Sequence, residues 1–210
     1  MAVADIHSFH TIQSVSEGIY KEKGSKFLGF AYPVSNESEI KSRLEGLRKK
    51  YFDASHHCYA WMLGADKKRF RAFDDGEPSH SAGTPILGQI KSKNLTNVFV
   101  VVVRYFGGTK LGVGGLTQAY KAAAEAALAN AKIIEVEITS MFILNYDYTS
   151  SADVMQLVKD FDLVIENQEY DVLAKLKVSV KLKHKENFLK KLKLLNAIGV
   201  KVAYEEEWEN

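Results

Sequence analysis

The chain has 210 residues, 46% of them hydrophobic, with three prolines and a formal net charge of +2. This length predicts one or two domains, and the composition excludes a long disordered chain. No apolar run reaches the ~18–20 residues of a membrane helix. The single cysteine, Cys58, excludes an internal disulfide framework, and residues 1–7 lack the pattern of a signal peptide. We therefore expect a cytoplasmic protein without membrane association.

The net charge is divided unevenly along the chain. Residues 1–132 carry 18 Lys and Arg against 12 Asp and Glu, which gives +6, whereas residues 133–210 carry 10 Lys against 14 acids, which gives −4. A basic first half permits an anionic partner, although ordinary variation in surface charge gives the same pattern. We predict two domains, 1–132 and 133–210.

The first half alternates short strands with helices. We expect strands at 12–20, 25–34, 57–64 and 69–73, a turn at 22–24, a polar loop at 74–81 and a short helix at 85–90. Asn36 is the expected N-cap of a helix that runs to about residue 50, with Glu39 at the capping-box position.

The end of the first half carries the strongest local pattern. Residues 98–103 are wholly apolar and mostly β-branched, which predicts a strand buried on both faces. Five glycines and two cations follow, and an alanine-rich helix is expected from 118 to 131. Glycine lets backbone N–H groups approach a ligand, and a helix start carries partial positive charge. This segment therefore predicts a phosphate site. The proposed ligands are Arg104, Lys110 and the N–H groups of Gly107, Gly108, Gly114 and Gly115.

A structural interpretation of the same glycines is equally favoured. A tight turn would let the small residues Ala122, Ala123, Ala126 and Ala127 pack close to a sheet. ATP and NAD are poor candidates, because neither the P-loop spacing nor a complete dinucleotide fingerprint is present. We expect no cofactor.

The second half predicts the element order β-α-β-β-α-β. Strands are expected at 137–146, 163–168, 172–182 and 200–205, with helices at 151–161 and 186–196, and this order suggests a ferredoxin-like sandwich. In the third strand, alternate positions form a row of Lys175, Lys177, Ser179, Lys181 and Lys183. Such a row is more often a solvated sheet face than a nucleic-acid track. The acids at 205–207 are candidate partners for these lysines.

Two polar clusters could carry chemistry. In the first, His57, Tyr59 and Trp61 share one strand face that could stack bases or pack against another element, while Cys58 is expected to be a buried, inert thiol. The second is the loop Asp74-Asp75-Gly76-Glu77-Pro78. With His56, the residues Asp74, Asp75 and Glu77 form a possible polar site. Acids beside Gly and Pro are also typical of a turn, so we predict no dedicated metal site.

Four blocks in this chain resemble the YigZ/IMPACT family. They are His56-His57-Cys58-Tyr59-Ala60, residues 74–79, residues 82–85 and residues 103–112, and the resemblance extends over residues 21–131. Two positions depart from the family pattern, His80 in place of Gly and Gln118 in place of Arg. The second departure weakens a strictly electrostatic role for the helix start.

The resemblance implies an α+β protein with two domains. The first would be an α/β domain of the ribosomal protein S5 domain 2-like type and the second a ferredoxin-like domain. This pair is similar to the last two domains of elongation factor G. Eukaryotic relatives regulate translation by competing for an activator of an initiation-factor kinase, and no catalytic activity is firmly attached to the family.

These observations favour a non-enzymatic cytoplasmic protein that binds RNA or the ribosome and regulates translation. In this interpretation His57, Tyr59 and Trp61 add base stacking to the phosphate site. Two alternatives stay open. One is a metal-assisted hydrolase of a peptide or phosphorylated substrate, which would use His56, Asp74, Asp75 and Glu77. The other is a protein-interaction module, as in the eukaryotic relatives.

Overall fold

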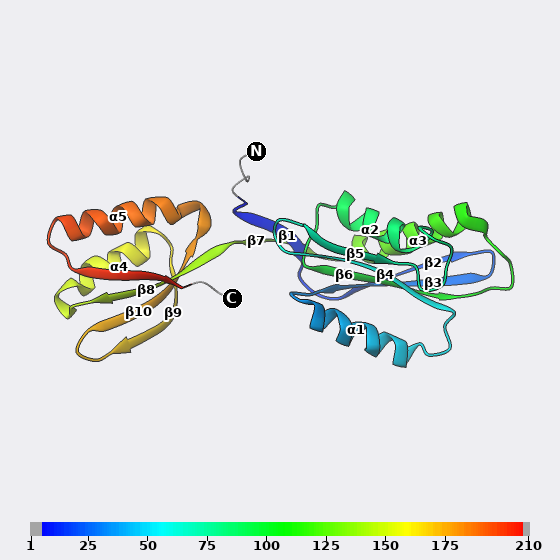
Figure 1. The fold of residues 1–210 in the computed structure, drawn as a ribbon, viewed down its shortest axis with the longest axis horizontal. Coiled ribbons are helices and arrows are strands. Elements are labelled where there is room, and N and C mark those ends of the chain that lie inside the picture. Colours follow the sequence, from blue (N-terminus) through cyan, green and yellow to red (C-terminus); the bar gives the residue numbers. More distant parts are fainter. Residues whose placement is uncertain (1–5, 208–210) are drawn as a thin grey trace. The chain divides into compact units, whose positions relative to one another are not determined.

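The computed structural model describes residues 6–207, so the expected domain ends and part of the segment 1–7 lie outside the described residues. The described chain divides into two compact units (Figure 1). An N-terminal unit comprises residues 9–136, and a C-terminal unit comprises residues 137–207 together with residues 6–8. Both units combine helices with antiparallel sheets, which confirms the α+β class. No helix among the described residues is long and apolar enough to cross a membrane.

The N-terminal unit is built on a five-stranded antiparallel sheet with the order β2-β3-β6-β4-β5. A separate two-stranded sheet pairs β1 with β7. The elements are β1 Ser8–Ile12, β2 Ser16–Glu22, β3 Ser25–Pro33, α1 Glu37–Lys50, β4 His56–Leu63, β5 Arg69–Phe73, α2 Gly83–Ser92, β6 Val98–Tyr105, α3 Gly112–Ala129 and β7 Ile133–Glu137.

Helices cover both faces of the five-stranded sheet, with α2 and α3 on one face and α1 on the other (Figure 1). The predicted double burial of 98–103 is confirmed, because each of these six residues has no exposed surface. They lie on β6, the central strand. Val98, Val100 and Val102 belong to the core under α2 and α3, while Phe99 and Val101 belong to the core under α1.

Local sequence explains the start of α1 and the first hairpin. The Asn36 side chain accepts a hydrogen bond from the Glu39 N–H at 3.0 Å, and the Glu39 carboxylate accepts one from the Ser35 N–H, so the predicted cap is confirmed. Lys23 and Gly24 have φ angles of 45° and 77°. Two consecutive positive φ angles are typical of the two-residue turn that matches strand twist.

Two expectations about element bounds are wrong, and one observed strand was not expected. The expected strand 12–20 is two strands, β1 and β2, separated at residues 13–15, which are exposed. The strand β7 is not among the expected elements. The helix α3 begins at Gly112, six residues before the expected start, so Gly114 and Gly115 lie in its first turn, while Gly112 itself has a φ of +71°. Glycine has low helix propensity, but buried residues of α3 beginning at Leu116 anchor this first turn by tertiary packing.

Glycines in the sheet let α3 approach closely. A Cβ atom at Gly18 would lie 2.3 Å from the Ala127 nitrogen, and one at Gly29 would lie 2.4 Å from the Ala123 carbonyl oxygen. Ala123 and Ala127 are themselves fully buried. The close alanine packing expected for this helix is therefore present, and any side chain at Gly18 or Gly29 would push α3 off the sheet.

The C-terminal unit has a four-stranded antiparallel sheet with the order β11-β8-β10-β9. One face of the sheet packs on the two helices, and the alternate apolar residues of β10 (Ala174, Leu176, Val178 and Val180) belong to this core. The elements are β8 Thr139–Tyr146, η1 Tyr148–Ser150, α4 Ser151–Asp160, β9 Val164–Tyr170, β10 Ala174–Lys181, η2 Leu182–His184, α5 Lys185–Ala197 and β11 Val202–Glu207.

Candidate functional site

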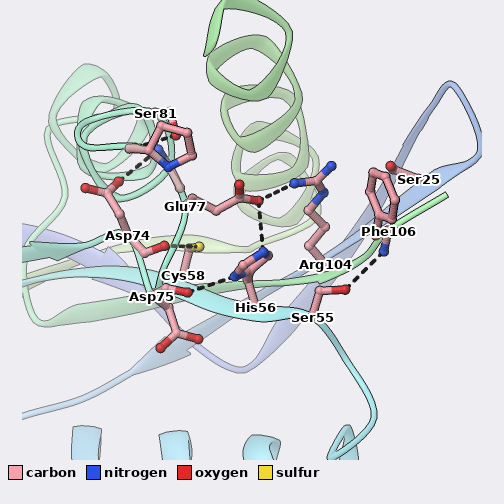
Figure 2. Close-up of polar contacts among 12 residues, drawn as sticks. Ser25, Ser55, His56, Cys58, Asp74, Asp75, Glu77, Ser81, Arg104 and Phe106 are labelled. Atoms are coloured by element: carbon pink, nitrogen blue, oxygen red, sulfur yellow. Dashed lines mark hydrogen bonds and ion pairs between the residues drawn. The ribbon is translucent and has the colours of Figure 1, made fainter. Parts of the chain in front are cut away.

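The loop between β5 and α2 brings three carboxylates to the ends of β4 and β6 (Figure 2). Asp74 organises the backbone of this loop. Its carboxylate accepts hydrogen bonds from the N–H groups of His80, Ala82 and Gly83 at 2.8–3.0 Å, the last two at the start of α2. Burial opposes ionisation of Asp74, but these three N–H groups outweigh it and hold the pKa below its ordinary value. Asp74 is therefore a helix cap for α2.

Asp75 connects the loop to β4 and α1. Its carboxylate accepts hydrogen bonds from the His57 N–H at 2.7 Å and from the Arg48 guanidinium at 3.2 Å. The residue adopts a φ of +43°. Its carbonyl oxygen lies 2.8 Å from Nδ1 of His56. Asp75 thus uses its carboxylate and its carbonyl oxygen to hold the loop in place.

Glu77 is the centre of a buried polar cluster. Its Oε1 accepts hydrogen bonds from the Arg104 guanidinium at 2.5 Å and from the Tyr120 hydroxyl at 2.7 Å. The side chains of Glu77 and Arg104 are only 4% and 6% exposed. Figure 2 shows Glu77 between Arg104 and His56, whose Nε2 lies 3.8 Å from the same oxygen. One carboxylate therefore joins β4, β6 and α3.

Arg104 is too buried to bind a phosphate group from solution. Its guanidinium lies over the rings of Phe27 and Phe106, at 5.4 and 5.5 Å from their centroids. The cation is held between two aromatic rings and neutralised by Glu77. The placement of Arg104 in the anion site is corrected on this ground, because burial and ion pairing already use its charge.

Cys58 of β4 and Tyr120 of α3 also belong to this buried cluster. The Cys58 thiol donates to the Asp74 carbonyl oxygen at 2.9 Å and lies 3.3 Å from the Tyr120 hydroxyl. Burial is the largest cause that raises the pKa of Cys58 far above its usual range, and burial likewise raises the pKa of Tyr120. A thiol held in its protonated form is a poor nucleophile, as expected for a core cysteine.

The cluster does not assemble a set of metal ligands. Among residues 6–207, no three His, Cys, Asp or Glu side chains form a group that could hold a metal ion. Asp74 and Asp75 direct their carboxylates to backbone N–H groups and Arg48, and Glu77 binds Arg104 and Tyr120. These contacts hold the loop in place, and they leave none of the three carboxylates free to act as a general acid or base.

His57, Tyr59 and Trp61 lie on the other face of β4, under α1. Their exposed fractions are 7%, 8% and 8%. Burial lowers the pKa of His57, so the ring is held neutral in this layer. Base stacking needs an open ring face, and α1 covers these rings. The expectation that they stack bases is corrected, since their packing role in the core uses the same faces.

Gly107 serves the packing of two loops. A Cβ atom there would lie 1.9 Å from the carbonyl carbon of Gly24, and the Gly107 N–H donates to the Ser25 hydroxyl at 3.1 Å. This N–H is therefore not available to a ligand. The contact places residues 106–111, the glycine loop between β6 and α3, directly against the hairpin between β2 and β3.

The first residues of α3, 112–114, are exposed to solvent. The first four N–H groups of a helix lack partners inside it, and in α3 these belong to residues 112–115, including Gly114 and Gly115. The N-cap Leu111 makes no side-chain capping bond, and the first turn contains no acid. Gly108, with a φ of +83°, and Lys110 are exposed just before it. This part of the predicted anion site keeps the exposure and polarity that it requires.

Three lysines that the sequence interpretation missed join Lys110 at this end of the sheet. Lys21, Lys23 and Lys26 lie in or beside the hairpin that contacts Gly107, and all are exposed. Lys21 and Lys26 pair with each other, and Lys26 pairs with Tyr105, so both point to the α1 face of the sheet, whereas Lys23 lies in the turn next to Gly24. None of these four lysines has an ion-pair partner within residues 6–207. The hairpin and the glycine loop are about 80 residues apart in sequence, so no local pattern indicates their contact. Tyr120 was missed too, although it is the one polar aromatic residue in the apolar stripe of α3.

The lysine row of the C-terminal sheet is neutralised by acids. The ion pairs are Lys175–Glu169, Lys177–Glu207, Lys181–Asp162, Lys183–Glu137 and Lys185–Glu206. Of the acids at 205–207, Glu207 pairs with Lys177 of the row, as expected, whereas Glu206 pairs with Lys185, which lies outside the row. This pairing favours the solvated face over the nucleic-acid track.

Comparisons with known proteins show the family of this chain. The Impact N-terminal domain model matches residues 23–128. The IMPACT family member YvyE of Bacillus subtilis is 30% identical over 165 residues, covering 79% of this chain and 76% of YvyE. The IMPACT family member YigZ of Escherichia coli is 32% identical, covering 75% and 78%. A crystal structure described as a hypothetical protein is 28% identical, with a TM-score of 0.68 and coverage of 96% and 99%. The chain therefore belongs to the IMPACT family.

Proposed function

We propose that this protein is a non-enzymatic, cytoplasmic RNA- or ribosome-binding protein that regulates translation. The observation that carries the proposal is the open start of α3, where Lys110 and the N–H groups of Gly114 and Gly115 lie beside a lysine-bearing hairpin. Unpaired N–H groups and cations together favour phosphate. The proposed anion site consists of Gly108, Lys110, Gly114, Gly115 and Lys23.

We also propose that the two units are the domains expected from the family resemblance. In the C-terminal unit, the element order β8-α4-β9-β10-α5-β11 and the strand order β11-β8-β10-β9 support a ferredoxin-like domain. The N-terminal unit would then be the ribosomal protein S5 domain 2-like domain, and the pair would resemble the last two domains of elongation factor G. The division of the chain near residue 136 supports domains close to 1–132 and 133–210. A protein with this architecture would act on the translation machinery.

Co-sedimentation with ribosomes tests the proposal. Lysate containing the full chain is fractionated at low and moderate salt, with a nuclease-treated control. We expect salt-sensitive co-migration with a ribosomal subunit or RNA, because phosphate contacts release counterions. The double variant Lys23→Glu, Lys110→Glu should lose this co-migration, while Lys159→Glu, Lys190→Glu, which reverses two exposed charges of the C-terminal unit, should keep it.

Purified protein and a defined RNA sharpen the result. A plot of log affinity against log salt concentration has a negative slope, and each lost phosphate contact reduces the magnitude of that slope by about 0.7–0.9. Loss of both lysines should therefore reduce the slope as well as the affinity. Wild-type and doubly reversed proteins with the same slope would show that this end of the sheet is not the phosphate site. Absence of the wild-type chain from every ribosomal and RNA fraction would contradict the proposal itself.

The metal-assisted hydrolase receives no support from the described residues. Its candidate residues are engaged with one another or with backbone groups, and their thiol neighbour Cys58 is held protonated. The remaining alternative, a protein-interaction module, requires a surface suited to a protein partner. One edge of the N-terminal sheet offers such a surface.

A further inference from the structure

The strand β5 ends the five-stranded sheet on one side. In the described part of the chain it pairs with β4 alone, so alternate N–H and C=O groups along its outer edge have no strand to bind. Residues 69–72 are exposed. A free strand edge is a template for an added strand.

The two faces of β5 have different chemistry. The register pairs Trp61 with Arg71 and Met62 with Phe70. Trp61 belongs to the core under α1 and Met62 to the core under α2 and α3. Because directly paired residues point to the same face, Arg69 and Arg71 lie on the α1 side and Phe70 on the α2 side. Phe70 is 49% exposed.

A groove of about 480 Å³ lies between α1 and the outer strands on the arginine side. Tyr59 and Trp61 line it from β4, and Lys41 and Arg71 line it from α1 and β5. Within residues 6–207 neither Lys41 nor Arg71 has an ion-pair partner. The acid of the groove, Glu37, is already bound to Arg69. The groove therefore has an excess of positive charge, and only the edges of Tyr59 and Trp61 reach its surface.

We propose that β5 is the docking edge for an acidic, extended segment of a partner protein, which adds to the sheet as a sixth strand. Backbone hydrogen bonds to the free edge would supply affinity, and the two faces would supply specificity. Acidic side chains of the segment meet Arg71 and Lys41 on the α1 side. Apolar side chains at the alternate positions meet Phe70 on the other side. The recognised pattern is thus acidic–apolar alternation over about five residues, the length of β5.

A second copy of this chain does not fit the edge as well. Antiparallel pairing of two β5 strands would place Arg69 and Arg71 of both copies on one face, where opposed like charges destabilise a sheet. A single-stranded nucleic acid also fits less well. Tyr59 and Trp61 expose only 8% of their surface, so neither ring offers a face on which a base can stack.

This docking edge is independent of the proposed phosphate site. It uses α1, β4 and β5, whereas the phosphate site uses α3 and the hairpin between β2 and β3. Substitutions at Lys41 and Arg71 therefore leave every residue of the phosphate site unchanged. Failure of one proposal does not entail failure of the other.

A peptide selection tests the docking edge. A displayed library of random dodecamers is selected on the immobilised full chain, and enriched sequences are synthesised with a fluorescent label. We expect enrichment of Asp or Glu alternating with apolar residues. The double variant Lys41→Glu, Arg71→Glu should weaken binding about tenfold or more, because like charges then face each other. The matched control Lys49→Glu, Lys121→Glu reverses two exposed charges away from the groove and should bind as the wild type does.

Backbone pairing is tested with the same peptides. N-methylation of the amides that face β5 should abolish binding, and methylation of the alternate amides should not, because only one set pairs with the edge. Amide NMR shifts should map to residues 69–73. The proposal is overturned if no acidic peptide is enriched, if binding is insensitive to both the charge reversal and N-methylation, or if a ten-nucleotide oligo(U) displaces the peptide through Lys41 and Arg71. Circular dichroism confirms that each variant is folded.

Discussion

The two units of this protein use their cations differently. In the C-terminal unit, the lysines along and beside β10 each lie next to a carboxylate of a neighbouring element. At the glycine-loop end of the N-terminal unit, Lys21, Lys23, Lys26 and Lys110 are exposed without such partners in the described chain. A lysine with its own carboxylate adds little field beyond its contact, whereas grouped unpaired lysines create a positive potential. Pairing, rather than lysine number, distinguishes a solvated face from a candidate anion site.

The same contrast continues inside the N-terminal unit. Arg104 and Lys110 are six residues apart, yet the first is buried against Glu77 and the second is exposed beside a helix start. The buried cation stabilises the fold, and the exposed one is available to a ligand. The following predictions test this division.

Removal of Arg104 should have the largest effect. The substitution Arg104→Ala leaves Glu77 buried without its cation, and breaking such a pair costs about 3–5 kcal/mol. The free energy of unfolding, measured by urea denaturation, should fall by this amount. Lys110→Ala, the exposed control, should change it by no more than about 0.5 kcal/mol. Equal effects of the two substitutions would end the distinction between the two cations.

Asp74 sharpens the comparison, because backbone N–H groups rather than a cation stabilise its charge. Asp74→Ala removes the cap of α2 and should cost about 0.5–2 kcal/mol. The pKa of Asp74 is lowered in the folded state, so its contribution is present above the ordinary pKa of about 3.9 and is lost as pH falls through the folded-state value.

Unfolding measured between pH 2 and pH 6 checks this dependence. The wild type should lose stability at the acid end, and the loss should be smaller in Asp74→Ala because the group that titrates is absent. An unchanged pH profile in the variant would show that other carboxylates account for acid destabilisation. Asn at this position is a useful further variant, since it retains an oxygen acceptor without the charge.

The surface ion pair Lys177–Glu207 should have the smallest effect. Both side chains are partly exposed, at 34% and 42%, so solvent weakens their attraction. A double-mutant cycle with Lys177→Ala and Glu207→Ala should give a coupling of about 0.2–1 kcal/mol that decreases with added salt. A coupling of several kcal/mol would place this row with Arg104 rather than with the solvent-exposed ion pairs.

Sequence patterns predicted the elements best where one local rule acts. The apolar run at 98–103, the cap at Asn36 and the alternation along β10 each correspond to an observed element. Sequence patterns predicted the ends of helices and strands poorly where tertiary packing overrides local propensity. Glycine disfavours a helix, yet α3 begins within the glycine loop because its buried residues from Leu116 onward pack on the sheet.

The site residues show the same limit. The sequence indicated which segments carry polar residues, but it did not indicate that Arg104 turns inward to Glu77 or that α1 covers Trp61. Arg104 and Glu77 are 27 residues apart, and Gly107 and Ser25 are 82 apart. Contacts of this range depend on how strands pair and which face each helix covers, and a local pattern carries neither.

By itself, the sequence determined the α+β class, the order of the main elements and the family, because hydrophobic period, capping and motif order are local properties of a chain. Tertiary structure decided which charged groups face the solvent. Burial and pairing removed Arg104, His57, Tyr59 and Trp61 from the candidate anion site, and loop contact brought the turn that carries Lys23 beside the glycine loop. The physical reason is that a side chain packed in the core or paired with an opposite charge is not available to a ligand, whereas an exposed and unpaired cation is.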